Sequence, residues 1–230
     1  MLDWKTIDTV LFDMDGTVLD LHFDNYFWEE FVPARYAVLK GLSQQEASIL
    51  LRSQYAGVKG TLDWYCLDFW SAQLALDIPA LKEELRHKIA LRPNALPFIM
   101  ALRRQGKQVA LVTNAHPDSL RLKMDHTGIA EHFDHRISSH DFGLAKENAG
   151  FWQALRQQFP YEPGRTLLID DSLPVLHQAR AEGIAHLRAI RQPDSQRDAL
   201  PAQHSFAQID DFADIMTGLV TCNEQGTTQG

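Results

Sequence analysis

The chain has 230 residues, of which 45% are hydrophobic and 23% are charged, as in an ordinary globular protein with room for one core and a modest insertion. Its net charge of −8 argues against a general nucleic-acid binder, which would present a basic surface. No apolar run approaches the ~20 residues that span a membrane, and the N-terminus lacks the pattern of a signal peptide. Two cysteines make no disulfide framework, so we expect a cytoplasmic protein without a membrane partner.

The first predicted strand, residues 9–12, is apolar on both faces, as buried parallel strands are. From residue 21 to residue 91 the chain shows helical patterns and no convincing strand. Ser43 and Glu46 have the spacing of a capping box, which marks the start of a helix. We therefore expect an all-helical cap over 21–91, inserted after the first strand and placed above that strand's carboxyl end.

Beyond this insertion, strand and helix patterns alternate. Further strands are predicted at 108–112 and 166–169, with weaker candidates at 135–138 and 186–190. Amphipathic helices are predicted from the apolar faces at 96–102, 117–127, 151–155 and 175–179. The alternation predicts an α/β fold with a doubly wound parallel sheet, in which 1–20 and 92–216 form a Rossmann-like catalytic core. Residues 217–230 are polar and are predicted to form a flexible tail.

Two carboxylates follow the first strand directly, in the sequence Asp13-Met14-Asp15-Gly16. Ligands of open α/β sheets bind at the carboxyl ends of the strands, and two acids there repel each other unless a cation neutralises them. Gly16 lets the chain turn sharply after them. The alternative is a loop in which the two acids only cap a helix, which the preceding strand and the polar groups on later strands disfavour.

Polar groups also follow the strand at 108–112 and precede a later helix. Thr113 and Asn114 supply a hydroxyl and backbone N–H groups that can cradle an anion, although both residue types are also common helix caps. Lys146 supplies the cation that an acidic protein needs in order to bind a phosphate, although a lone lysine is more often a solvated surface residue.

Asp170 and Asp171 follow the strand at 166–169. Clustered carboxylate oxygens suit Mg²⁺, which takes few protein ligands and keeps several waters. One of these two aspartates could instead cap the helix that begins near Pro174.

The residues described above form four groups along the chain: Asp13 with Asp15, Thr113 with Asn114, Lys146, and Asp170 with Asp171. In their order and residue types they resemble the four motifs of the haloacid dehalogenase superfamily, and the insertion resembles its helical cap. The resemblance implies a phosphatase in which Asp13 is the nucleophile and forms an aspartyl-phosphate. It implies that Asp15 protonates the leaving oxygen and then activates water. Asp15 must therefore be a usable acid, and we expect the nearby Asp13 to raise its pKa. Dehalogenases need no such acid for a halide, so Asp15 separates this chain from them.

The same resemblance implies phosphate contacts from Thr113, Asn114 and Lys146. It also implies one Mg²⁺, bound by Asp13, the Asp15 backbone carbonyl and Asp170, with Asp171 either a direct ligand or one shell further out. The metal and Lys146 would polarise phosphorus for attack by a carboxylate, which is a weak nucleophile.

Three segments resemble more closely the bacterial GMP/IMP nucleotidase branch of that superfamily: 20–28, 62–68 and 113–117. This resemblance extends to about residue 210. It implies a purine nucleoside monophosphate as the substrate, with nucleoside and phosphate as products.

Substrate choice is expected to come largely from the cap. We expect polar substrate contacts from three residues near the crevice: Asn25, Tyr26 and His116. Aromatic side chains of the cap could stack on a base, but aromatics at helical spacing are more often core. We therefore expect three tryptophans in the cap's own core: Trp28, Trp64 and Trp70.

Ten histidines raise the question of a zinc site. Zinc sites typically show closely spaced ligands, such as HxxxH or HxH beside a carboxylate or a cysteine. None of the ten has that context in the sequence, so we predict no zinc site.

Three other functions stay open. A phosphatase for sugar phosphates or phosphoglycolate would keep every motif and differ only in the cap. A phosphomutase would pass the phosphoryl group to a sugar instead of water. A non-enzymatic binding module is disfavoured, because Asp13 and Asp15 are both present.

Overall fold

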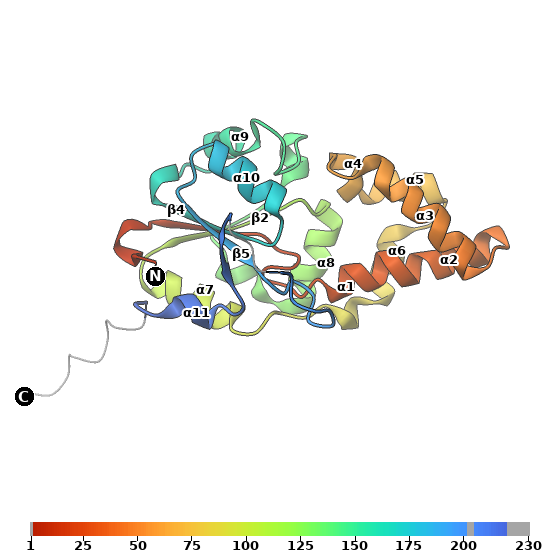
Figure 1. Ribbon diagram of the computed structural model, residues 1–230, viewed down its shortest axis with the longest axis horizontal. Coiled ribbons are helices and arrows are strands. Elements are labelled where there is room, and N and C mark those ends of the chain that lie inside the picture. Colours follow the sequence, from red (N-terminus) through yellow and green to blue (C-terminus); the bar gives the residue numbers. More distant parts are fainter. Residues whose placement is uncertain (1, 202–204, 220–230) are drawn as a thin grey trace, which may run out of the picture.

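A computed structural model describes residues 2–201 and 205–219 of the chain. One sheet of six parallel strands runs through it, in the order β3-β2-β1-β4-β5-β6 (Figure 1). The strands are β1 (Thr9–Phe12), β2 (Gln108–Thr113), β3 (His135–Ser138), β4 (Thr166–Asp170), β5 (His186–Ile190) and β6 (Ala207–Ile209). The five strands predicted from the sequence are confirmed to within one residue at each end. β6 was not predicted, because so short a strand shows no readable alternation.

Helices cover both faces of this sheet (Figure 1). Those of the core are η1 (Trp4–Thr6), α7 (Ala95–Arg104), α8 (Pro117–Thr127), η4 (Ile129–His132), η5 (Ser139–Phe142), α9 (Phe151–Gln158), η6 (Pro163–Arg165), α10 (Leu173–Ala181) and α11 (Ala213–Met216). Val10 and Phe12 of β1 pack in one hydrophobic cluster with residues of α7 and α8. Leu11, between them, packs in a second cluster with residues of α9 and α10. The sheet is therefore doubly wound, as predicted.

The helical cap follows β1 and forms the other end of the molecule (Figure 1). Its helices, in residues 22–88, are α1 (His22–Tyr26), the π-helical turn η2 (Phe27–Phe31), α2 (Val32–Lys40), α3 (Gln44–Val58), α4 (Leu62–Tyr65), α5 (Leu67–Leu74), α6 (Ile78–Glu84) and η3 (Arg86–Lys88). The predicted capping box at the start of α3 is confirmed. The Glu46 N–H donates to Ser43 Oγ at 3.3 Å, and the Ser43 N–H donates to Glu46 Oε2 at 2.9 Å.

The cap has an aromatic core of its own. Tyr55 lies at its centre, with its ring 5.8, 5.6 and 5.0 Å from the rings of Trp28, Trp64 and Trp70. All three contacts are edge-on, an arrangement that aromatic rings favour. Trp70 is 2% exposed, and its Nε1 donates to the Trp64 carbonyl at 2.9 Å. The prediction that Trp70 is a core residue is confirmed.

Two chain segments join the cap to the core, and they run antiparallel and hydrogen-bond to each other. The Asp20 N–H donates to the Ala90 carbonyl, and the Arg92 N–H donates to the Val18 carbonyl, both at 2.9 Å. These contacts lie at the predicted edges of the cap. They support the predicted division of the chain near residues 20 and 91, which stays a proposal.

The predicted flexible tail, 217–230, lies outside the described residues from position 220 onward. Leu219 is 4% exposed, and Gln105 Nε2 donates to its carbonyl at 2.9 Å, so the chain packs against the core as far as Leu219.

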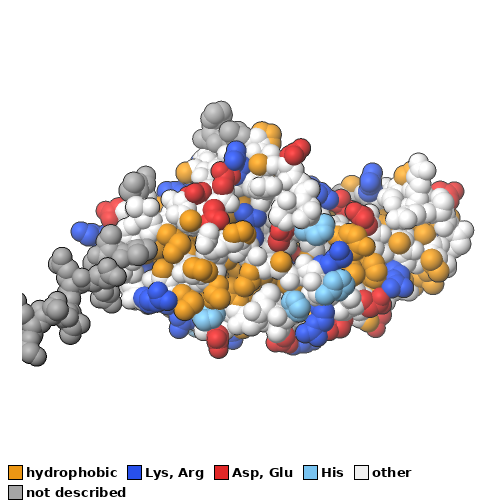
Figure 2. Space-filling view, turned by 90° about the horizontal axis from the view of Figure 1, so that it is seen from below, with side chains coloured by type: hydrophobic (Ala, Val, Ile, Leu, Met, Phe, Trp, Pro, Cys, Tyr) orange, Lys and Arg blue, Asp and Glu red, His pale blue; other side chains and the backbone are white. Residues whose placement is uncertain are grey.

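Within residues 2–201 and 205–219, none of the helices combines the length and the apolar character needed to span a bilayer. Acidic and basic side chains are mixed over the face drawn in Figure 2.

Candidate active site

The candidate site lies at the carboxyl ends of three neighbouring strands. β1 lies between β2 and β4 in the sheet, with Phe12 paired in register to Leu111 and Ile169. The residues that follow these positions therefore meet at one edge, because parallel strands all end on the same side. Asp13 comes from β1, Thr113 from β2 and Asp170 from β4.

Lys146 joins these strand ends. Its Nζ donates to Asp13 Oδ1 at 2.6 Å, to Asp170 Oδ2 at 2.7 Å and to the Val112 carbonyl at 3.0 Å. Burial opposes the charge of Lys146, but the carboxylates of Asp13 and Asp170 outweigh burial and raise its pKa. Lys146 is 1% exposed, so it is a buried ammonium held by two carboxylates and not a solvated surface lysine.

Asp13 keeps one oxygen free. Oδ1 accepts from Lys146, whereas Oδ2 is buried and has no hydrogen-bond partner among the described residues. Burial raises the pKa of Asp13 to about 6; Lys146 opposes this shift and Asp170 adds to it. A buried carboxylate oxygen without a partner is costly, so this atom is poised to meet a ligand.

Three carboxylates could hold a divalent cation here. Asp13, Asp170 and Asp171 each offer an oxygen, and these atoms lie within 4.8 Å of one another. Burial and the charges of Asp13 and Asp170 raise the pKa of Asp171 well above its usual range. When all three are ionised, they carry three negative charges against one positive charge on Lys146, which leaves the charge that one divalent cation neutralises. Hard oxygen ligands of this kind fit Mg²⁺.

Asp15 lies in a second charged network, which the sequence did not indicate. Lys123 Nζ donates to Asp15 Oδ1 and to Asp24 Oδ2, both at 2.6 Å. Lys82 Nζ, from the cap helix α6, donates to Asp24 Oδ1 at 2.8 Å. Lys123 and Lys82 are buried. Nothing in the local sequence separates Lys123 from an ordinary surface lysine of α8, so only the fold reveals its role.

This network sets the ionisation of Asp15. Burial raises the pKa of Asp15 to about 6; the charge of Asp24 adds to this shift and Lys123 opposes it. The expected rise is thus confirmed, but Asp13 contributes less to it than burial and Asp24 do. Burial also opposes ionisation of Asp24, but Lys123 and Lys82 outweigh it and lower the pKa of Asp24 to about 2.

Thr113 and Asn114 play different parts. Thr113 Oγ1 accepts the Ala115 N–H at 3.0 Å, which leaves the hydroxyl hydrogen available to a phosphoryl oxygen. The Asn114 side chain instead holds the loop of Lys146: its Oδ1 accepts the Lys146 N–H and its Nδ2 donates to Glu147 Oε2, both at 2.8 Å. The Asn114 side chain is therefore a positioning group, and only its backbone is left for a phosphate.

A cavity of about 830 Å³ opens between the core and the cap, and its lining includes Asp13, Asp15, Thr113, Lys146 and Asp170. Of the predicted substrate contacts, Asn25 and His116 line this cavity and Tyr26 does not. The Tyr26 ring instead packs under Lys88 Nζ, which lies 4.3 Å from the ring centroid, so nothing in the cavity lining supports Tyr26 as a substrate contact. Asn25 Nδ2 donates to Asp194 Oδ2 at 2.7 Å, which leaves its oxygen available.

The three tryptophans of the cap pack in its core, as predicted, but two of them have a second environment. Trp28 and Trp64 line the cavity, although both also belong to the aromatic core around Tyr55. A side chain at the edge of a core can pack with one face and present the other to a ligand, which periodicity alone cannot show. The cavity lining also includes three residues that the sequence analysis did not single out: Arg52, Tyr55 and Lys59.

Comparisons with known proteins place these features in a family. A family model for haloacid dehalogenase-like hydrolases matches residues 7–176. The GMP/IMP nucleotidase YrfG of Escherichia coli strain K12 is 46% identical over 192 residues, which cover 84% of this chain and 86% of that protein. A phosphoserine phosphatase of Thermus thermophilus is 25% identical over 56% of this chain and 51% of its own length. The crystal structure of a HAD phosphatase from Thermococcus onnurineus superimposes with a TM-score of 0.78 at 25% identity, covering 91% of this chain and 96% of that one.

Gly16 allows a test of the carboxylate cluster. Its φ is +88°, and a Cβ there would lie 2.6 Å from Asp171 Oδ2. Gly150 also has a φ of +88°, but a Cβ there would meet nothing within 4 Å. Gly16→Ala and Gly150→Ala should therefore share a backbone cost of about 1–2 kcal/mol, while Gly16→Ala alone displaces Asp171.

We expect calorimetric titration to show Mg²⁺ binding at least about tenfold weaker in Gly16→Ala than in Gly150→Ala. Urea unfolding of both variants measures the shared backbone cost. Equal Mg²⁺ affinity in the two variants would show that Asp171 does not support a cation.

Proposed function

This chain belongs to the haloacid dehalogenase-like hydrolase family, and on that premise we propose that it is a Mg²⁺-dependent phosphomonoester hydrolase with Asp13 as its nucleophile. One observation carries the proposal. Lys146 holds one oxygen of Asp13 and leaves the other buried at a residue that lines the cavity, with no hydrogen-bond partner in the described part of the chain. A carboxylate fixed in this way keeps a lone pair available for attack.

In the first half of the reaction, Asp13 Oδ2 attacks the phosphorus of the bound ester. A bond forms between this oxygen and phosphorus, the bond between phosphorus and the ester oxygen breaks, and an aspartyl-phosphate results. Asp15 gives its proton to the departing oxygen, so the leaving group departs as an alcohol. The raised pKa of Asp15, about 6, lets a carboxyl group act as an acid near neutral pH.

In the second half, the same carboxylate acts as a base. Asp15 takes a proton from a water molecule whose oxygen attacks the phosphorus. The bond to Asp13 breaks, inorganic phosphate leaves, and Asp15 is protonated again. Lys123 and Asp24 hold the Asp15 carboxyl in one place through both steps.

The remaining polar groups stabilise the charge of the phosphoryl oxygens. The Thr113 hydroxyl and the Lys146 ammonium would bind these oxygens, and Asn114 fixes the Lys146 loop. Mg²⁺ would be held by Asp13, Asp170 and Asp171, whose oxygens cluster within 4.8 Å, and by the Asp15 carbonyl that the family resemblance implies. When bound, it supplies a Lewis acid that neutralises charge on the phosphoryl group.

We further propose that the substrate is a purine 5′-monophosphate such as GMP or IMP. The name of the 46%-identical relative supports this choice. The cavity supports it too: its volume of about 830 Å³ lies in the range of small-molecule sites. Trp28 and Trp64 offer aromatic faces to a base, and Arg52 and Lys59 add positive charge at the lining.

Removal of the nucleophile tests the chemistry. We expect Asp13→Asn to lower kcat by at least about 10⁴-fold, as loss of a nucleophile does elsewhere. Acid quenching of the wild-type enzyme with labelled substrate should trap phosphate on the protein, and Asp13→Asn should trap none. Asp125→Asn, at an exposed position of α8, should trap as much as wild type. Labelled protein in Asp13→Asn would disprove the assignment.

The network around Asp15 predicts opposite pH shifts in two variants. The charge of Asp24 raises the pKa of Asp15 and Lys123 lowers it. In Asp24→Asn the pKa of Asp15 should fall, so the alkaline limb of kcat/KM, where the acid loses its proton, moves to lower pH. In Lys123→Met the pKa of Asp15 should rise, so the alkaline limb of kcat/KM moves to higher pH.

Both variants break buried ion pairs and should lower the free energy of unfolding by about 3–5 kcal/mol, so circular dichroism at each pH is the control for folding. General damage to the site cannot produce shifts of opposite sign. If the alkaline limb moved in the same direction in both variants, Asp15 would not be the general acid.

A substrate panel tests the nucleotide proposal. We expect kcat/KM for GMP and IMP to exceed that for sugar phosphates and phosphoglycolate by at least about tenfold. Trp64→Leu should lower kcat/KM for GMP by about 5–150-fold, the equivalent of about 1–3 kcal/mol of base stacking, and that for phosphoglycolate much less. The ratio within one variant cancels any loss of folded enzyme. Similar kcat/KM values for all of these substrates would favour a general small-molecule phosphatase.

A further inference from the structure

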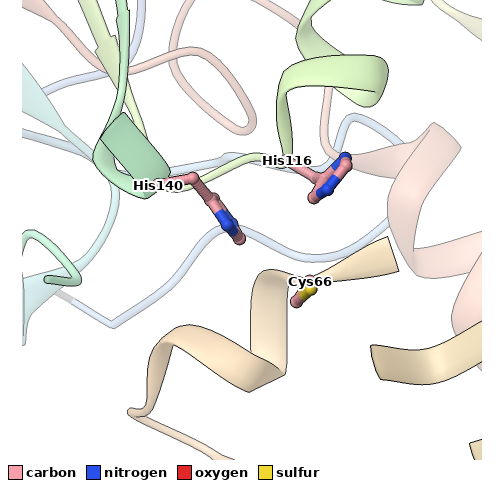
Figure 3. A group of neighbouring side chains, drawn as sticks. All are labelled: Cys66, His116 and His140. Atoms are coloured by element: carbon pink, nitrogen blue, oxygen red, sulfur yellow. The ribbon is translucent and has the colours of Figure 1, made fainter. Parts of the chain in front are cut away.

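A second group of metal-ligating side chains lies where the cap meets the core. Cys66, His116 and His140 each offer one ligand atom, and these atoms lie within 4.8 Å of one another. Figure 3 shows the three side chains around one space. Cys66 belongs to the cap, between α4 and α5, whereas His116 precedes α8 and His140 lies in η5 of the core. The hydrolase chemistry proposed above uses none of these atoms.

His140 is arranged as a ligand in need of a partner. Its Nε2 is buried and makes no hydrogen bond to any described residue. A buried imidazole nitrogen without a hydrogen-bond partner is costly, and a neutral ring nitrogen is a common metal ligand.

His116 has acidic partners on both sides of its ring. Nε2 lies 3.6 Å from Asp68 Oδ2, and Nδ1 lies 3.7 Å from Asp118 Oδ2. Nδ1 also accepts the Asp118 N–H at 3.3 Å, so Nε2 is the nitrogen left to bind a cation. The hydrogen bond from Asp118 fixes the orientation of the ring, and the Asp68 carboxylate places a negative charge beside Nε2, which favours a cation there.

Cys66 completes the group and also caps α5. Its Sγ accepts the Phe69 N–H at 3.4 Å at the start of α5, a position at which Ser, Thr, Asp or Asn is preferred. Cys66 is half-buried, so an ion can reach it. It is the only cysteine among the residues that the structure describes.

We propose that Cys66, His116 and His140 form a binding site for a thiophilic divalent cation, with Zn²⁺ as the representative ion, which bridges the cap and the core. One sulfur and two imidazole nitrogens suit Zn²⁺ and not Mg²⁺, so this site and the carboxylate site select different metals. Three protein ligands leave a fourth position open to water or another ligand. Zinc bonds are about 2.0–2.3 Å long, and ligand atoms that lie within 4.8 Å of one another are close enough to share one ion after small side-chain adjustments.

The expectation of no zinc site rested on spacing along the chain. The three ligands are far apart in the sequence and come from three different elements, so no local pattern could reveal them. A cation held between Cys66 and the two histidines would tie the cap to the core beside the cavity that His116 lines. It should therefore stabilise the protein and slow any step that needs the cap to move.

Titration with Co²⁺ tests the site without reference to activity. The parent protein is the full chain carrying Cys222→Ser, which leaves one thiol. We expect CoCl₂ to produce a sulfur-to-cobalt charge-transfer band in the near ultraviolet, saturating at one equivalent and displaced by ZnCl₂. The band should vanish in Cys66→Ser and need at least about tenfold more Co²⁺ in His140→Gln. It should be unchanged in His87→Gln, at an exposed position of the cap.

Thermal unfolding adds a second measurement. ZnCl₂ in the presence of saturating Mg²⁺ should raise Tm in the parent and in His87→Gln, because a ligand that binds only the folded state stabilises it. It should not raise Tm in His140→Gln, which retains the thiol and reports on the site even if Cys66→Ser fails to fold. Absence of the band in the parent, or a Tm rise that survives in His140→Gln, would overturn the proposal.

Discussion

The structure depends on how buried carboxylates at the end of a sheet are neutralised. Desolvation makes ionised aspartates costly, and it is the largest influence on the pKa of Asp13, Asp15, Asp170 and Asp171. Lys146 offsets this cost between two strands, with bonds of 2.6 and 2.7 Å to Asp13 and Asp170. Because one ammonium cannot balance three ionised carboxylates, an excess of negative charge remains, and a divalent cation would neutralise it.

The same electrostatic logic links the cap to the reaction centre. Asp24, at the start of the cap, lies between Lys82 of the cap and Lys123 of the core, and Lys123 in turn holds Asp15. The position of the cap therefore affects the environment of the group assigned to proton transfer. Tyr65 makes a second link, since its hydroxyl donates to Glu147 Oε1 at 3.0 Å. The proposed site at Cys66 would make a third polar link between the cap and the core.

Features that depend on a few consecutive residues could be predicted from the sequence. The strands and the capping box at Ser43 lie where they were predicted. The same patterns did not show which cap side chains face the cavity. Tyr26 packs against Lys88 and is not part of the cavity lining, while Trp64 both packs in the aromatic core and lines the cavity. Helical periodicity identifies a buried face, but it cannot tell whether that face is covered by protein or by a ligand cavity.

The sequence by itself determined the doubly wound sheet, the helical insertion and the chemical groups at the strand ends. The reason is that hydrophobic period and strand-end position are encoded within a few consecutive residues. Only the tertiary structure decided the partners of those groups. It joined Lys123 to Asp15, committed the Asn114 side chain to the Lys146 loop, and gathered Cys66 with two distant histidines. Such contacts depend on how helices and strands that are distant in sequence pack together, and no local sequence pattern specifies that packing.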